Sequence, residues 1–421
     1  MSPRYKEEST GSFMVGSGRD IDEMRFQEIV IKTADFVTAR PRNMEKCGAF
    51  SHIEGTELEL LDHDFQFTID RSNDPNCELY LQTTDRCNLK CPGCAVGLDK
   101  TSRKGAVLTS LSEIQRTIGE TIAVFADAGK KHLKVKYAGG EPTLQVENIN
   151  ELSEFTKSEA DAHDLSTDHV LITNGTLLTK DTVRKIGDMN MRINISLWGM
   201  GDTNDRERGN MGKPSFKKIF KGINYCKELG VPLSLTYIVT PTNAGELTPF
   251  INTFATDANT KISIALFRPQ KPEQLKQIET SIEKMIDGIR DGIRAAEYIV
   301  TSGIATDAFR DFGYLRANGL NLFGCGAGES YFAIDSKGKR HSCHEAIGNE
   351  ALQGKNIPQL GLITKDGGDL LDMWVMLHGG MCPQKNDGYR ISESYPRKIY
   401  RSIAADLILL ECERQERFGY E

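Results

Sequence analysis

Three cysteines, Cys87, Cys91 and Cys94, lie within one eight-residue segment of this 421-residue chain. Cysteine thiolates ligate iron–sulfur clusters, and three of them can hold three irons of a [4Fe–4S] cube. The fourth iron then has open positions for chemistry, whereas a cluster with every iron ligated by protein mainly carries electrons. The spacing therefore predicts a reactive iron–sulfur site.

Two other interpretations of this segment stay open on spacing alone. A structural zinc ion takes four ligands, commonly from two Cys-x-x-Cys pairs, and Cys77 is the one nearby cysteine that would complete such a set. The second interpretation is a group of unligated thiols. A disulfide framework is not expected, because the chain is long and its ten cysteines fit a reducing compartment.

Further motifs follow the cysteines in a fixed order. An apolar, strand-like run, Leu79–Thr83, precedes the first cysteine, and Tyr137–Pro142, with the sequence Tyr-Ala-Gly-Gly-Glu-Pro, ends another such run about forty-five residues after the third. Four shorter segments come later: Thr173-Asn174-Gly175, Ile195-Ser196-Leu197, Arg208-Gly209 and Ile238-Val239-Thr240-Pro241-Thr242-Asn243. Together with the cysteines, these segments resemble the radical S-adenosylmethionine (SAM) superfamily, densely over residues 78–270 and more thinly beyond.

The resemblance implies a [4Fe–4S] cluster whose open iron binds the amino and carboxylate groups of SAM. One electron from the reduced cluster then cleaves a carbon–sulfur bond, and the 5′-deoxyadenosyl radical removes a hydrogen atom from a substrate. A reductant of the flavodoxin or ferredoxin type is expected as a partner.

The Gly-Gly-Glu-Pro segment is expected to bind the methionine end of SAM. Gly139 and Gly140 have no Cβ, so the backbone can approach the amino group closely. Glu141, or a carbonyl beside it, is the expected acceptor for the ammonium, and Pro142 fixes the turn. Taken alone, this tetrapeptide is an ordinary turn, and only its place after the cysteines favours the SAM interpretation.

Three polar residues farther along complete the expected SAM site. Asn174 ends the third strand, Ser196 would bond the ribose hydroxyls or the SAM carboxylate, and Arg208 would pair with a carboxylate in a bidentate manner. Each has an ordinary explanation by itself, as a turn residue, a strand serine and a solvated charge.

One position departs from the family pattern. The family usually has an aromatic residue directly before the third cysteine, where it packs on adenine, and this chain has Gly93 there. Adenine is then expected to lean on another side chain, such as Leu266 or Phe267.

Short β-type runs alternate with longer amphipathic segments through the middle of the chain. The strands are predicted at 78–84, 133–138, 169–173, 192–197, 232–239 and 261–267. The helices are predicted at 109–128, 145–163, 179–187, 214–229 and 244–257. This alternation indicates an α/β fold with parallel strands, and six such units resemble a partial (β/α)6 barrel of the TIM type. In such barrels the chemistry lies at the carboxyl ends of the strands, where the motifs above fall.

A second cysteine set is Cys325 and Cys343, with Gly338 between them in the pattern Cys-x12-Gly-x4-Cys. The intervening residues 331–342 alternate like a hairpin that turns at Asp335–Gly338. This pattern resembles the start of the SPASM extension of radical SAM enzymes, which carries auxiliary clusters.

The rest of that extension is incomplete. Cys382 aligns with a family ligand, but His378 and Arg397 stand where other cysteines are expected. The resemblance therefore implies one auxiliary [4Fe–4S] cluster on Cys325, Cys343 and Cys382, as in the shorter Twitch arrangement. The fourth ligand is either absent, leaving an open iron, or one of several candidates: Cys412, His341, His344, Cys47 or Cys77. Buried thiols are the alternative for these cysteines, and Cys226 is predicted to be one.

His344 and Glu345 directly follow Cys343 and are the predicted catalytic residues. In dehydrogenating relatives a carboxylate at this place accepts the substrate proton, and histidine has a pKa suited to that work near neutrality. A hydrogen-bonded surface histidine is the competing interpretation.

Composition and length set the remaining expectations. The net charge of −7 and the isoelectric point near 5.8 give no general attraction to nucleic acid. No apolar run reaches the roughly eighteen residues of a membrane helix, so a cytoplasmic protein is expected. The predicted divisions are a small cap of unclear fold at 1–77, the radical SAM core at 78–270, bridging helices at 271–319, a SPASM/Twitch-like cluster domain at 320–385 and a C-terminal helix at 386–421.

Three functions are compatible with these features. The first is oxidative modification of a peptide or protein side chain, because the SPASM-like extension is common in such maturases. The second is dehydrogenation of a small molecule such as an amino sugar, a cyclitol or an alcohol. The third, an iron–sulfur protein without radical chemistry, is disfavoured by the open-iron cysteine pattern.

Overall fold

The computed structural model describes residues 12–14, 20–22, 75–94, 111–208, 214–256, 260–267, 269, 272–301, 326–347, 399 and 403. The predicted N-terminal cap and C-terminal helix lie almost entirely outside these residues, as do Cys47, Cys325, Cys382 and Cys412. Near the N-terminus, β1 (Ser12–Met14) and β2 (Asp20–Asp22) pair antiparallel.

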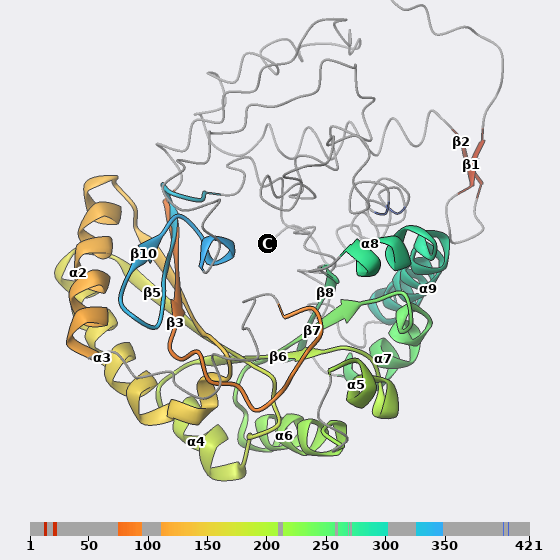
Figure 1. Cartoon of the computed structure of the whole chain (residues 1–421), viewed down its shortest axis with the longest axis horizontal. Helices are drawn as coiled ribbons and strands as arrows, with labels where there is room; N and C mark the ends of the chain where they lie inside the picture. Colours follow the sequence, from red (N-terminus) through yellow and green to blue (C-terminus); the bar gives the residue numbers. More distant parts are fainter. Residues whose placement is uncertain are drawn as a thin grey trace, which may run out of the picture.

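The core is a curved sheet with the strand order β10-β9-β3-β4-β5-β6-β7-β8. Six neighbouring strands, β3 to β8, run parallel to one another. Their bounds are Asn76–Gln82, His132–Ala138, Ser166–Thr173, Arg192–Leu197, Leu233–Val239 and Thr260–Leu266. Figure 1 shows the sheet bent into an open arc with the helices along its outer side. This is the predicted partial (β/α)6 barrel.

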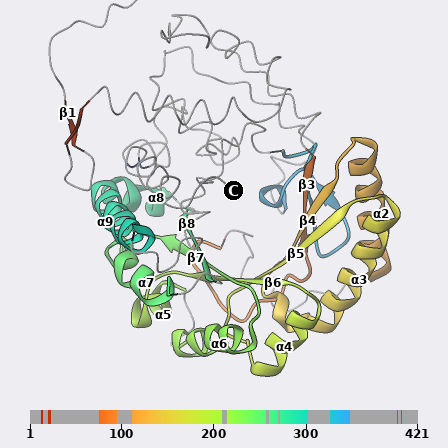
Figure 2. The same cartoon turned by 180° about the vertical axis from the view of Figure 1, so that it is seen from behind.

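Helices connect successive strands on the outer side, which Figure 2 shows from behind. They are α2 (Leu111–Asp127), η3 (Pro142–Gln145), α3 (Val146–Ala162), α4 (Lys180–Asp188), α5 (Gly201–Glu207), α6 (Phe216–Leu229), η4 (Ala244–Glu246) and α7 (Leu247–Phe254). Two more, α8 (Pro272–Glu279) and α9 (Ile282–Thr301), follow the last strand. The predicted strands and connecting helices are confirmed to within a few residues, and α8 and α9 lie within the segment where bridging helices were predicted.

The two faces of the sheet differ in character. Leu79, Val135 and Ile195 are fully buried and belong to the core shared with the outer helices. Side chains that alternate with them, such as Glu78 and Ser196, point to the inner, concave face and are only half-buried. This alternation places the polar groups of the sheet inside the arc.

The predicted hairpin is confirmed and extends the barrel sheet. β9 (Tyr331–Ile334) pairs parallel with β3, and β10 (Arg340–His341) pairs antiparallel with β9. Gly338 has φ +78°, and a Cβ there would lie 3.2 Å from the backbone of Glu113 in α2. Thr117 of α2 also donates to the Gly338 carbonyl at 2.7 Å. The glycine of the Cys-x12-Gly-x4-Cys pattern therefore serves a left-handed turn pressed against a helix.

His169 of β5 is a buried histidine on the helix side of the sheet. Its Nδ1 lies 3.0 Å from the Tyr137 hydroxyl, and its Nε2 has no hydrogen-bond partner among the described residues. Burial, with a further contribution from Lys157, lowers the pKa of His169 from 6.5 to about 4. At pH values between about 4 and 6.5, this histidine is therefore neutral in the folded protein, whereas it is protonated in the unfolded chain.

We expect this histidine to make the fold sensitive to mild acid. Because the folded pKa lies below the unfolded one, its stabilisation is complete above pH 6.5 and is lost as the pH falls toward 4. Between pH 7 and pH 5 the free energy of unfolding should fall by about 2 kcal/mol from this residue. Urea unfolding at both pH values measures it, and His169→Gln should show a smaller pH dependence. An equal pH dependence in the two proteins would contradict the assignment.

Candidate active site

The three cysteines lie in a loop at the carboxyl end of β3, the end where the motifs were predicted to gather. All three thiols are half-buried and free of disulfides. The Leu89 amide donates to Cys87 Sγ at 3.4 Å, and burial raises the pKa of the Cys87 thiol to about 11. A thiol with this pKa is protonated at neutral pH, and binding of a metal centre would displace its proton.

The three loop cysteines supply the thiol donors that an iron–sulfur cluster uses. Within the described part of the chain, no three His, Cys, Asp or Glu side chains converge on one metal-sized point. A zinc ion would need all its sulfur ligands about 2.3 Å from one centre. A cube places each thiolate on a different iron, so it does not need this convergence.

Gly139 and Gly140 pack directly against the start of the cysteine loop. The Gly140 amide donates to the Thr84 carbonyl at 2.7 Å, and the Glu141 amide donates to the Arg86 carbonyl at 2.8 Å. A Cβ on Gly139 would lie 2.4 Å from the Thr84 oxygen, and one on Gly140 would lie 2.2 Å from the Arg86 oxygen. The space saved by these glycines is therefore taken by the chain's own backbone, which is a different reason from the predicted approach to SAM.

The Glu141 carboxylate is fully buried and saturated with hydrogen bonds. It accepts from the amide and hydroxyl of Thr143, from the Thr173 hydroxyl at 2.6 Å and from the Asn174 amide at 2.8 Å. Buried Pro142 follows it and opens η3. These four donors engage the carboxylate within the protein.

Asn174 binds the cysteine loop rather than facing open space. Its Nδ2 donates to Asn88 Oδ1 at 2.8 Å, and Asn88 in turn donates to the Thr176 hydroxyl at 2.8 Å. Its Oδ1 accepts from the Thr176 amide at 2.9 Å. The side chain therefore ties the carboxyl end of β5 to the loop between Cys87 and Cys91.

Arg208 carries an unsatisfied buried donor. The residue is 6% exposed, it donates through Nη1 to the Ser196 carbonyl, and its Nε has no partner among the described residues. An unpaired guanidinium N–H is costly to bury, and a carboxylate would satisfy it. Arg208 is the C-cap residue of α5, a short helix that was not predicted from the sequence. Ser196 lies on the concave face of β6, and its carbonyl holds the Arg208 guanidinium beside it.

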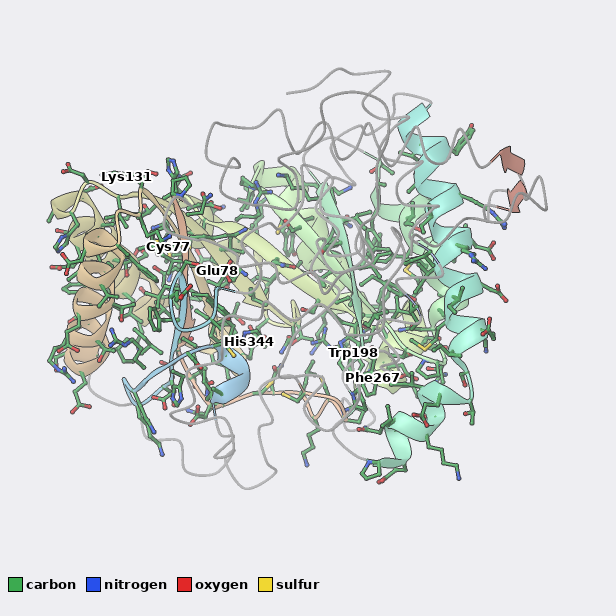
Figure 3. The ribbon with its side chains drawn as sticks, turned by 90° about the horizontal axis from the view of Figure 1, so that it is seen from above. Cys77, Glu78, Lys131, Trp198, Phe267 and His344 are labelled. Atoms are coloured by element: carbon green, nitrogen blue, oxygen red, sulfur yellow. The ribbon has the colours of Figure 1, made fainter. Side chains whose placement is uncertain are left out.

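Of the two residues proposed to face adenine, Phe267 lies against Gly93 and Leu266 packs with the outer core. Phe267 also contacts Trp198 in an edge-to-face geometry, with ring centroids 5.5 Å apart. Figure 3 shows the two rings next to each other, with His344 on the opposite wall of the curved sheet.

Cys343 is the described member of the second cysteine set. It is buried and packs with Ala327 and Ala346. The Gly328 amide donates to the Ser342 carbonyl at 3.1 Å, so the segment that follows Cys325 is held beside Cys343.

The described candidates for a fourth auxiliary ligand have other partners. His341 Nε2 lies 2.9 Å from Asp335 Oδ2, and Cys77 Sγ points to the helix side, 3.5 Å from the His132 carbonyl oxygen. His344 Nδ1 lies 2.5 Å from the Tyr331 hydroxyl, and its ring stacks on Tyr80 at 5.1 Å. The Glu345 side chain is outside the described residues. Cys226 is a buried thiol, as predicted, with its pKa raised by burial to about 12.

None of the described helices is long and apolar enough to cross a membrane.

Known proteins match the core region. Residues 81–253 match the Radical SAM superfamily model. An uncharacterized protein of Methanocaldococcus jannaschii is 26% identical over 198 residues, which cover 47% of this chain and 65% of that protein. The serine-type anaerobic sulfatase-maturating enzyme of Bacteroides thetaiotaomicron is 38% identical over 88 residues, 21% of each chain. The PqqA peptide cyclase of Rhodopseudomonas palustris is 25% identical over 308 residues, 70% of this chain and 72% of that one.

The solved structure "Native anSMEcpe with bound AdoMet and Cp18Cys peptide" has the same fold. It superposes with a TM-score of 0.54 at 15% identity, covering 82% of this chain and all of that chain. The chain spans 65% or less of the first two relatives named above, so their activities do not transfer with the match. The matched segment contains all three loop cysteines and the Gly-Gly-Glu-Pro turn on a partial (β/α)6 barrel. The chain therefore contains a domain of the radical SAM superfamily, whose members use a [4Fe–4S] cluster and SAM.

Proposed function

We propose that this protein is a radical SAM oxidoreductase that modifies a peptide or protein side chain by hydrogen abstraction. The observation that carries the proposal is the cysteine loop, held at the carboxyl end of β3 by the Gly-Gly-Glu-Pro turn, together with the buried Arg208 Nε, which has no partner among the described residues. A reducing cytoplasm and a flavodoxin- or ferredoxin-type reductant belong to the same proposal.

Different residues of the chain would bind the cluster and the two charged groups of SAM. Cys87, Cys91 and Cys94 would hold three irons, and the Arg208 Nε–H would donate to the SAM carboxylate, its missing partner. The turn carbonyls beside Glu141 accept from the ammonium, because the carboxylate itself is already occupied. A [4Fe–4S] cluster and SAM bound by these residues would supply one-electron cleavage of the carbon–sulfur bond of SAM, which gives methionine and a hydrogen-abstracting 5′-deoxyadenosyl radical.

A peptide substrate is favoured by the names of two relatives, a sulfatase-maturating enzyme and a peptide cyclase. The test uses deuterium-labelled peptides encoded beside the gene, with labelled amino sugars, cyclitols and alcohols as the comparison panel. Deuterium in 5′-deoxyadenosine, together with a mass change in the peptide, is the expected result. Transfer from a small molecule but from no peptide would contradict the peptide assignment and favour a small-molecule dehydrogenase.

We also propose one auxiliary [4Fe–4S] cluster on Cys325, Cys343 and Cys382. It is supported by the packing of Ala327, two residues after Cys325, against Cys343. His344 or Glu345, directly beside this cluster, would accept the substrate proton. The Nδ1 of His344 lies 2.5 Å from the Tyr331 hydroxyl, which orients the ring.

Replacing the three auxiliary cysteines with alanine should lower iron from about eight to about four per chain. Cleavage of SAM should survive, because the cysteine loop after β3 is untouched. Iron analysis and 5′-deoxyadenosine yield measure both effects, with Cys226→Ala as the thiol control that keeps about eight irons. A wild-type protein with about four irons would show that the auxiliary cluster does not exist.

A further inference from the structure

The hairpin and the cysteine loop leave the sheet at the same edge. β9 pairs parallel with β3, and Ile334, the last residue of β9, is level with Leu81 near the end of β3. Because the two strands run in the same direction, the hairpin turn and the loop that starts after Gln82 emerge together. Figure 1 shows the hairpin at the β3 end of the arc.

A single carboxylate joins these two segments. Oδ1 of Asp85 accepts from the Ser336 hydroxyl at 2.7 Å and also from the side-chain amide of Gln82. Both donor residues are buried, with Ser336 9% exposed and Gln82 3% exposed. Hydrogen bonds to an ionised acceptor are roughly twice as strong as those between neutral groups. Asp85 therefore links the hairpin to the start of the cysteine loop across 251 residues of sequence.

The hairpin turn is itself fixed by contacts within the protein. The Asp335 carboxylate accepts from the backbone amides of Lys337 and Lys339, both at 2.9 Å. Its second oxygen lies 2.9 Å from Nε2 of His341. The turn also packs against α2 through its glycine. Ser336 therefore extends its hydroxyl from a fixed turn, so its hydrogen bond can restrain the position of Asp85.

The residues on either side of Asp85 are held by a different element. The carbonyls of Thr84 and Arg86 accept from two amides of the Gly-Gly-Glu-Pro turn, at 2.7 Å and 2.8 Å. Cys87 follows directly after them. The entry to the cysteine loop is therefore held by two elements, the turn after β4 and the hairpin, and Asp85 is the contact with the hairpin.

We propose that the Asp85–Ser336 hydrogen bond is a brace through which the hairpin holds the thiols of the cysteine loop in position for a cluster. Asp85 and Ser336 are positioning residues, because they act through the loop that carries Cys87. The hairpin then has two roles, since it also leads into Cys343 of the second cysteine set. The inference rests on the proposed function in one respect: the loop thiols must be the ligands of the reactive cluster.

The brace is measured by the rate at which iodoacetamide alkylates Cys87 in the full chain before reconstitution, followed by peptide mass spectrometry. Ser336→Ala removes the hydroxyl and should raise this rate about tenfold, because the loop opens more often. Ser336→Thr keeps a hydroxyl and should stay within about twofold of the parent. Cys226 is the internal reference, since it is fully buried in α6 and reacts only when the core opens.

Two further variants show whether the hydrogen bond itself is responsible. Asp85→Ala should also accelerate the alkylation of Cys87, and adding Ser336→Ala to it should have no further effect, because both changes remove the same bond. Ser166→Ala is the matched control. Its hydroxyl donates to the Lys131 carbonyl at 3.2 Å, at the amino end of the sheet, so its loss should leave the Cys87 rate within about twofold of the parent.

Several results would overturn the brace. These are a Ser336→Ala protein whose Cys87 reacts at the parent rate, an equal acceleration of Cys87 and Cys226, a Ser336→Thr protein as fast as Ser336→Ala, and additive effects in the double variant. The measurement needs neither cluster nor SAM, so it is independent of the reaction. The expected alkylation pattern in a chain that forms no 5′-deoxyadenosine would support the brace and overturn only the proposed function.

Discussion

Replacing Cys87 with alanine is expected to abolish reductive cleavage of SAM and to remove about four irons per chain. Two remaining thiolates leave two irons of a cube without protein ligands, and such a cluster is not retained. The Cys87 sulfur also accepts two hydrogen bonds, from the Leu89 backbone amide at 3.4 Å and from the Asn174 side-chain amide at 4.0 Å. Its loss therefore removes an anchor of the loop as well as an iron ligand.

Iron analysis and the electron paramagnetic resonance signal of the reduced cluster measure this effect. Cys226→Ala is the control, since that thiol is buried in α6. Any auxiliary cluster should persist in Cys87→Ala, so the iron content of this variant also measures how much auxiliary cluster is present. A Cys87→Ala protein that keeps its full iron and still forms 5′-deoxyadenosine would place the reactive cluster elsewhere in the chain.

The second large effect is expected from Gly140→Ala. Its Cβ would lie 2.2 Å from the carbonyl oxygen and 2.6 Å from the carbonyl carbon of Arg86, and these backbone atoms cannot rotate away. The cysteine loop must then shift relative to the turn, which also breaks the Gly140–Thr84 hydrogen bond. We expect the free energy of unfolding to fall by about 3 kcal/mol and the cluster content to fall with it.

Gly245→Ala is the matched control for this substitution. A Cβ on Gly245, in η4, would have nothing within 4 Å. Urea unfolding of the two apoproteins and iron content after reconstitution give the comparison. Equal stability and equal iron content in the two variants would contradict the assigned contact between the turn and the cysteine loop.

Features with a local pattern were predictable from the sequence. The six strands and the core-facing helices follow from apolar periodicity, and the hairpin follows from alternation around a turn rich in polar residues. The three loop cysteines were predicted to form a site from their spacing alone. In contrast, α5 was missed because its seven residues, Gly-Asp-Thr-Asn-Asp-Arg-Glu, are polar and bury only Asn204, so no apolar face marks the helix.

The contacts that define the site depend on pairs distant in sequence. The reason for Gly139 and Gly140 lies in the backbone of Thr84 and Arg86, which only the pairing of β3 with β4 brings close. The saturation of Glu141 depends in the same way on donors at the end of β5. The motif predicts that these residues matter, but tertiary packing decides what each of them touches.

The most direct test of the account is the product formed from SAM by the reconstituted protein and a strong one-electron reductant. Under anaerobic conditions we expect 5′-deoxyadenosine and methionine in equal amounts, identified by mass spectrometry and dependent on the reductant. The complete absence of 5′-deoxyadenosine under every reducing condition, from a protein that holds its iron, would contradict the proposal that this chain makes a radical.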